Sequence, residues 1–132
     1  MFTVLAIALM AFANFETPKE KGFNKSFAEV LRSAKAYTLE VAETMPEADY
    51  SFKPSDSVKT FGEQIAHIGM STQLLHSVFN KGEEMKMDPA EGAKLEKEMG
   101  QSKQACIDQI NKSYDTAIVT LENLSDTELQ ET

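Results

Sequence analysis

The sequence predicts an all-α domain, and three observations support that class. The chain has 132 residues, enough for one ordinary domain. Hydrophobic residues make up 42% and charged residues 26%, with only six Gly and four Pro, which is typical of a globular chain. Runs of Val, Ile and Thr are absent, whereas apolar residues recur at three- and four-residue steps in three long segments. We therefore expect a helical bundle.

The first predicted helix covers residues 26–45. Pro46 ends it, because proline lacks an amide hydrogen and disfavours helical geometry at the residue before it. The apolar stripe of this helix comprises Phe27, Val30, Leu31, Ala34, Val41, Ala42 and Met45.

The second predicted helix covers residues 60–80. Thr60 and Glu63 form a capping box at its start, and Gly82 is a suitable stop. Its main apolar stripe comprises Phe61, Ile65, Ile68, Thr72, Leu75 and Phe79. A second apolar row, Met70, Leu74 and Val78, flanks that stripe and should be covered by a fourth helix or by a partner chain.

The third long helix is predicted over residues 102–124. Its apolar stripe comprises Ile107, Ile110, Tyr114, Ala117, Ile118, Leu121 and Leu124. The connection before it, residues 81–101, is long for a compact domain and suits a short helix, with Asp88 as cap, Pro89 at the first position and Glu91 in the first turn. A connection of this length can run back along a helix of ~30 Å. A crossover bundle is therefore more favoured than an up-down array.

The two ends of the chain carry different signals. Residues 1–13 have no charged side chain and match the apolar region of a signal peptide, or else an apolar helix that packs on the domain. Residues 14–25 read as an N-terminal arm, and the domain itself as residues 26–132. The protein is expected to be exported (periplasmic or secreted) if residues 1–13 are a signal peptide, and cytoplasmic otherwise. Ser125 and Glu128 form a capping-box pattern, as if another helix began there.

Charge and cysteine content exclude several classes of function. The formal net charge of −8 argues against a nucleic-acid surface, which needs clustered Lys and Arg. We expect no membrane-spanning segment in the mature chain, since residues 1–13 are too few to cross a bilayer. Cys106 is the only cysteine, so no disulfide or thiolate cluster can form within the chain. Its apolar neighbours favour a small buried side chain over a reactive thiol.

Both histidines lie in the second predicted helix. His67 and His76 are nine residues apart, or two and a half turns, so they project from opposite faces and cannot bind one metal together. His67 lies beside the apolar stripe, on the side of the second row, and is either a hydrogen-bonded core residue or a metal ligand. His76 has polar neighbours and reads as a surface or rim residue.

Two blocks of sequence resemble the DinB-like family. They are Phe52-Lys53-Pro54, within residues 45–54, and Thr60-Phe61-Gly62-Glu63-Gln64-Ile65-Ala66-His67. The resemblance implies a four-helix bundle that binds a divalent metal, zinc or nickel, through three His. His67 matches the ligand of the second helix, and the other two ligands lie in an H-x3-H pattern on the fourth helix. This chain contains no H-x3-H, so we expect the fourth helix to be missing from it and one ligand alone to hold metal weakly.

Two kinds of function follow, the first from the resemblance and the second from the uncovered apolar row of the second helix. The first is a divalent-metal-binding bundle. For a full-length form the resemblance implies the activity of a metal-dependent hydrolase or of a thiol S-transferase acting on a small molecule or thiol. The second is a non-enzymatic exported helical module that forms a homodimer through its exposed apolar face, the second row of the second helix (Met70, Leu74 and Val78). No residue is predicted to be catalytic.

Overall fold

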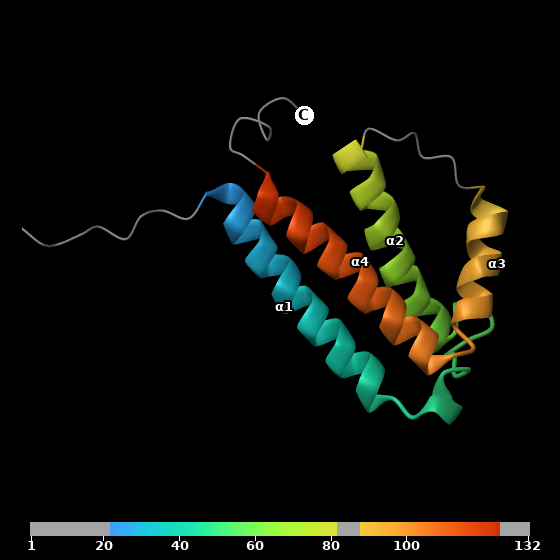
Figure 1. Ribbon diagram of the computed structural model, residues 1–132. Coiled ribbons are helices and arrows are strands. Elements are labelled where there is room, and N and C mark those ends of the chain that lie inside the picture. Colours follow the sequence, from blue (N-terminus) through green and yellow to red (C-terminus); the bar gives the residue numbers. More distant parts are fainter. Residues whose placement is uncertain (1–21, 82–87, 125–132) are drawn as a thin grey trace, which may run out of the picture.

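The computed structural model describes residues 22–81 and 88–124, and every regular element in these ranges is a helix. Figure 1 shows the helices α1, α2, α3 and α4. Their bounds are α1 Phe23–Thr44, a 3-10 turn η1 Glu47–Asp49, α2 Phe61–Lys81, α3 Pro89–Met99 and α4 Lys103–Asn123. The all-α class is confirmed, and the three long predicted helices correspond to α1, α2 and α4.

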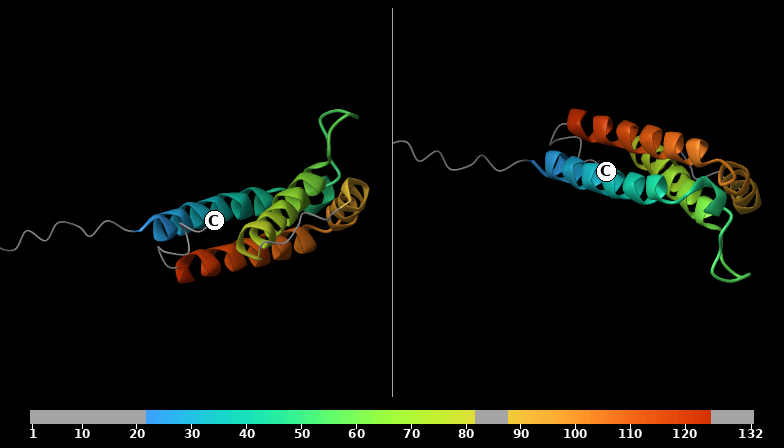
Figure 2. Two further views of the ribbon diagram at one scale, coloured as in Figure 1. Left: turned by 90° about the horizontal axis from the view of Figure 1, so that it is seen from above. Right: turned by 90° about the horizontal axis from the view of Figure 1, so that it is seen from below.

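Helix α4 is the element on which the other two long helices pack. Both α1 and α2 lie against α4, and α3 lies against α2. α1 runs antiparallel to α4, whereas α2 runs in the same direction as α4 (Figure 1). Figure 2 shows α2 crossing the α1–α4 pair at an angle. The connection through α3 therefore returns the chain to the end where α2 began, and the predicted crossover topology is confirmed.

The start of α1 differs from the prediction. The helix begins at Phe23, so residues 23–25, which we expected to belong to an N-terminal arm, are helical. The buried side chain of Asn24 donates a hydrogen bond of 2.6 Å to the main-chain oxygen of Leu124, at the end of α4. This tertiary contact between two distant residues stabilises an extra turn that local periodicity does not indicate.

Side chains cap the starts of α2 and α3 as the sequence predicts. In the capping box of α2, the Thr60 amide donates to the Glu63 carboxylate at 2.8 Å, and the Glu63 amide donates to the Thr60 hydroxyl at 3.2 Å. The Asp88 carboxylate accepts from the Ala90 amide at 2.7 Å and begins α3, the short helix expected in the long connection. Each bond satisfies an amide that has no partner within its helix.

Helix α1 ends through a contact supplied by Tyr50, the residue that follows η1. Pro46 has no amide hydrogen, so the Ala42 carbonyl lacks the donor that a continuing helix would provide. The buried Tyr50 hydroxyl donates to that carbonyl at 2.7 Å. The ring of Tyr50 also packs edge-on against Phe61, with ring centroids 5.1 Å apart. Tyr50 thereby joins the end of α1 to the start of α2.

The core lies where the long helices meet α4. It is made of buried side chains from all three long helices and from the turn between α1 and α2: Ala28, Ala42, Tyr50, Ile65, Ala66, Cys106, Ile110, Tyr114 and Ile118. At the end of the core where α2 and α4 begin, Gly62 of α2 touches the backbone of Gly100, between α3 and α4. A side chain at either position would separate these backbones.

Several predictions concern residues outside the described ranges. The signal-peptide region (residues 1–13), most of the N-terminal arm, the Gly82 stop and the capping-box pattern at Ser125 and Glu128 all lie there. These stay predictions. Among the helices of residues 22–81 and 88–124, none combines the length and the apolar character that crossing a membrane requires.

Candidate metal-ligand site

His67 lies in the second turn of α2, and its ring meets α3. The side chain is 50% exposed. Its Nδ1 lies 2.6 Å from Oε1 of Glu96, and its Nε2 lies 3.5 Å from the hydroxyl oxygen of Ser71. The first of these is a short, charge-assisted hydrogen bond, whereas the second is at the outer limit for one. One ring nitrogen is thus firmly held, and the other faces a much weaker partner.

Glu96 is the buried member of this group. Its second carboxylate oxygen pairs with the ammonium of Lys59, whose Nζ lies 3.5 Å from Nδ1 of His67. Burial by itself raises the pKa of the Glu96 carboxyl, but the hydrogen bonds from Lys59 and His67 outweigh it and hold the pKa below the usual value. We refer to these three residues as the Lys59–Glu96–His67 cluster.

The start of α2 and the short helix α3 position the cluster. Lys59 immediately precedes the capping box, so the start of α2 places it. Glu96 lies one turn after Gly92 in α3, and both are buried on the face toward α2. Sequence reasoning did not identify Lys59 or Glu96. A detectable signal was present: Glu96 falls on the same face of the short helix as Gly92 and Met99, where a charged residue needs a partner.

The second histidine has a separate environment. Nε2 of His76 lies 2.8 Å from the hydroxyl oxygen of Thr120 on α4, and the residue is partly exposed. Its prediction as a rim residue agrees with this position, and the two histidines do not meet. The row Met70, Leu74 and Val78 is partly exposed, and its cover by a fourth long helix or by a partner chain stays a prediction.

The residues present fit one part of a metal site. A neutral imidazole that donates Nδ1–H to a carboxylate presents an unprotonated Nε2, which is the form that binds zinc or nickel. His67 has the geometry of such a ligand. Within residues 22–81 and 88–124, however, no three His, Cys, Asp or Glu side chains are grouped so as to hold a metal ion. The described part of the chain therefore offers one nitrogen ligand and not a complete set.

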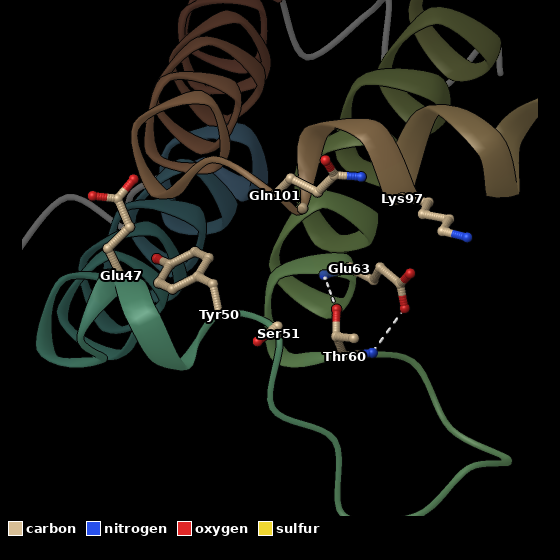
Figure 3. Close-up of a pocket in the computed structure, with 8 residues that line it drawn as sticks. Glu47, Tyr50, Ser51, Thr60, Glu63, Lys97 and Gln101 are labelled. Carbon is tan, nitrogen blue, oxygen red and sulfur yellow. Dashed lines mark hydrogen bonds between the residues drawn. The ribbon is translucent and has the colours of Figure 1, made fainter.

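A pocket of about 360 Å³ opens near the cluster, between η1, the start of α2 and the α3–α4 junction (Figure 3). The residues that line it are Glu47, Tyr50, Ser51, Thr60, Glu63, Lys97, Gly100 and Gln101. His67 does not line it. Thr60 and Glu63 bond to each other, as the dashed lines in Figure 3 show, and the Tyr50 hydroxyl bonds to Ala42. These three polar groups bond within the fold, and none of them is paired with His67.

Cys106 has the structural role that its neighbours predict. It is fully buried, and its thiol lies 3.5 Å from the carbonyl oxygen of Met99 and 3.6 Å from that of Gly62. Burial raises the pKa of the thiol to about 11. A thiol of this kind is not a nucleophile at neutral pH.

Comparison with known proteins agrees with the fold and the motifs. A family model described as the DinB superfamily matches residues 30–132. Searches of curated proteins and of solved structures gave no match. The match spans the described helices α2, α3 and α4, most of α1 and the whole Lys59–Glu96–His67 cluster. The chain belongs to the DinB superfamily.

Proposed function

We propose that this DinB-superfamily domain binds a divalent metal ion, zinc or nickel, with His67 as one of the ligands. The observation that carries the proposal is the half-exposed imidazole whose Nδ1 is held 2.6 Å from a buried carboxylate. Histidines that bind metals have this arrangement, one ring nitrogen bonded to a carboxylate and the other directed to the metal. The partner that the described residues give His76 is instead the Thr120 hydroxyl, 2.8 Å from its Nε2.

Paramagnetic Ni²⁺ tests this role even when binding is weak. In an NMR titration of the chain, the ring resonances of His67 should broaden at lower Ni²⁺ concentration than those of His76. His67→Ala should abolish the tighter phase, and His76→Ala, the matched control on the same helix, should leave it unchanged. Equal broadening in wild type and His67→Ala, or no broadening, would reject the ligand role.

The proposal extends to catalytic activity, which would depend on the bound metal. The resemblance implies hydrolysis or transfer of a small thiol, for which a bound divalent metal supplies Lewis-acid polarisation. Among the described residues, His67 would contribute a ligand nitrogen. Glu96 accepts from both Lys59 and His67, so its carboxylate is already engaged and we assign it no role as a base. A single imidazole is expected to hold metal weakly, so we predict no turnover from these residues alone.

A second candidate function is supported by a separate observation on α1. Five large apolar side chains that are spaced by three, four or seven residues are exposed along this helix: Phe23, Phe27, Val30, Tyr37 and Val41. Phe23 and Tyr37 are exposed by 69% and 70%. An apolar row of this kind is typical of a surface that another helix covers. The second candidate is therefore a non-enzymatic module that forms a homodimer, with this row as a contact surface.

Light scattering after size-exclusion chromatography tests the dimer. The wild-type chain should have the mass of two copies at high concentration, and Tyr37→Glu should shift it toward one. Ala36→Glu adds the same charge at an exposed neighbouring position outside the apolar row and is the control. A wild-type chain that stays monomeric at every concentration would reject this candidate.

A further inference from the structure

We propose that Glu96 is a positioning residue that holds the neutral His67 ring as the Nδ1–H tautomer and so leaves the lone pair on Nε2, the atom that would bind metal in the proposed function. The inference rests on the proposed ligand role of His67. It assigns a function to a buried carboxylate that comes from another helix, 29 residues further along the chain.

The hydrogen-bond partners determine where the ring proton lies. An ionised carboxylate only accepts hydrogen bonds, and a lysine ammonium only donates them. Oε2 of Glu96 accepts from Lys59, and Oε1 lies 2.6 Å from Nδ1 of His67. The Lys59 ammonium also lies 3.5 Å from Nδ1, but the carboxylate oxygen at 2.6 Å is much the closer partner. Nδ1 therefore carries the proton that the shorter bond requires. In the neutral ring the lone pair is then on Nε2, where Ser71 Oγ lies 3.5 Å away.

The same contacts also have a simpler interpretation, in which the cluster only ties α3 to α2. Glu96→Gln separates the two roles. Lys59 can only donate, so it takes the amide oxygen of the new side chain, and the amide NH2 then faces Nδ1 of His67. Nδ1 must accept in that arrangement, which moves the proton to Nε2. A simple tie between helices makes no such demand, because a glutamine of the same shape still bonds to both partners.

Long-range ¹H–¹⁵N correlation spectra of the metal-free chain identify the tautomer directly, at a pH above the range in which imidazoles ionise. We expect Nδ1–H in wild type and Nε2–H in Glu96→Gln. The double variant Lys59→Met, Glu96→Gln frees the amide to rotate and should restore Nδ1–H. Glu98→Gln, the same substitution at a site on α3 that is 59% exposed, should leave the wild-type tautomer.

Each outcome of these spectra is decisive. Nε2–H in wild type, or an unchanged tautomer in Glu96→Gln, would overturn the role of Glu96. A double variant that keeps Nε2–H would overturn the part assigned to Lys59. Folding is checked in the same samples by the backbone amide spectrum, and His76 is an internal reference whose tautomer should not change.

The Ni²⁺ titration separates this inference from the proposed function. Glu96→Gln should weaken binding at His67 by about 10- to 100-fold, the usual effect of losing a carboxylate behind a ligand histidine. Glu98→Gln should bind as wild type does. The expected tautomers without any Ni²⁺ binding would refute the proposed function and not the placement of the proton. Ni²⁺ binding by wild type, with no change of tautomer or affinity in Glu96→Gln, would refute the inference alone.

Discussion

Gly62→Ala would place a methyl group against the backbone of Gly100. A Cβ at position 62 would lie 2.9 Å from the carbonyl carbon of Gly100 and 3.1 Å from its Cα. The carbonyl oxygen of Gly100 would lie closer still to that Cβ. The reciprocal clash is less close, since a Cβ at position 100 would lie 2.6 Å from the Glu63 nitrogen. Neither backbone can rotate aside as a side chain can. The α3–α4 junction would have to move away from the start of α2.

The magnitude follows from two opposing effects. Overpacking a tight contact costs about 1 to 3 kcal/mol, and a backbone contact belongs at the upper end of that range. Alanine gains up to about 1 kcal/mol over glycine in helix propensity. Gly62→Ala should therefore lower the free energy of unfolding by about 2 kcal/mol. At an unfolding entropy of about 2.1 cal/mol/K per residue, each kcal/mol corresponds to about 4 °C in Tm for a domain of this size, so Tm should fall by about 8 °C.

Gly69→Ala is the matched control, because it makes the same change in the same helix. A Cβ there would lie 2.8 Å from Cγ of Gln109, part of a flexible side chain, and 3.3 Å from the main-chain carbon of that residue. The gain in helix propensity should largely offset the small shift of Gln109, leaving Tm within a few degrees of wild type. Thermal unfolding followed by far-ultraviolet circular dichroism measures both variants. A Gly62→Ala protein as stable as Gly69→Ala would refute the reasoning.

Three further predictions concern the contacts around the core. Tyr50→Phe should lower the free energy of unfolding by about 1 to 3 kcal/mol, because the Ala42 carbonyl loses its 2.7 Å donor; an unchanged urea midpoint would contradict this. Thr60→Ala should cost about 1 kcal/mol through the loss of the capping box, again read from urea unfolding, and no loss would mean that the cap is dispensable. Because burial raises the pKa of the Cys106 thiol to about 11, alkylation of the folded chain at neutral pH should be slow, and labelling as fast as in urea would be inconsistent with this burial. The folded state holds this thiol neutral, so its contribution to stability is complete below the ordinary thiol pKa and is lost as pH rises toward about 11.

Most of the fold was predictable because its signals are local. The capping box at Thr60 and Glu63, the Asp88 cap and the Pro46 stop act within a few residues of chain, and each is found where the sequence indicates it. The start of α1 was not predictable in this way. Asn24 extends the helix through a hydrogen bond to Leu124, 100 residues away. The pattern of apolar residues within α1 gives no sign of this bond.

In the candidate site, too, the local signal was predictable and the long-range contacts were not. His67 was identified from the residues around it, through the resemblance of the Thr60–His67 block to the DinB-like family. Its partners were not identified, because helical spacing around His67 places no specific carboxylate beside it. Glu96 reaches the ring only after the chain turns back through α3 and packs on α2.

By itself, the sequence determined the helical class, the three long helices, the crossover connection and the DinB superfamily. Periodicity, caps and motifs depend only on residues that are close together in the chain. Only the tertiary structure decided which groups meet. It brought Lys59 and Glu96 to one ring nitrogen of His67, placed Gly62 against Gly100 and gave the Ala42 carbonyl a donor in Tyr50. The physical reason is that each of these contacts joins segments whose proximity depends on how helices pack, and side-chain packing is not encoded at any single position.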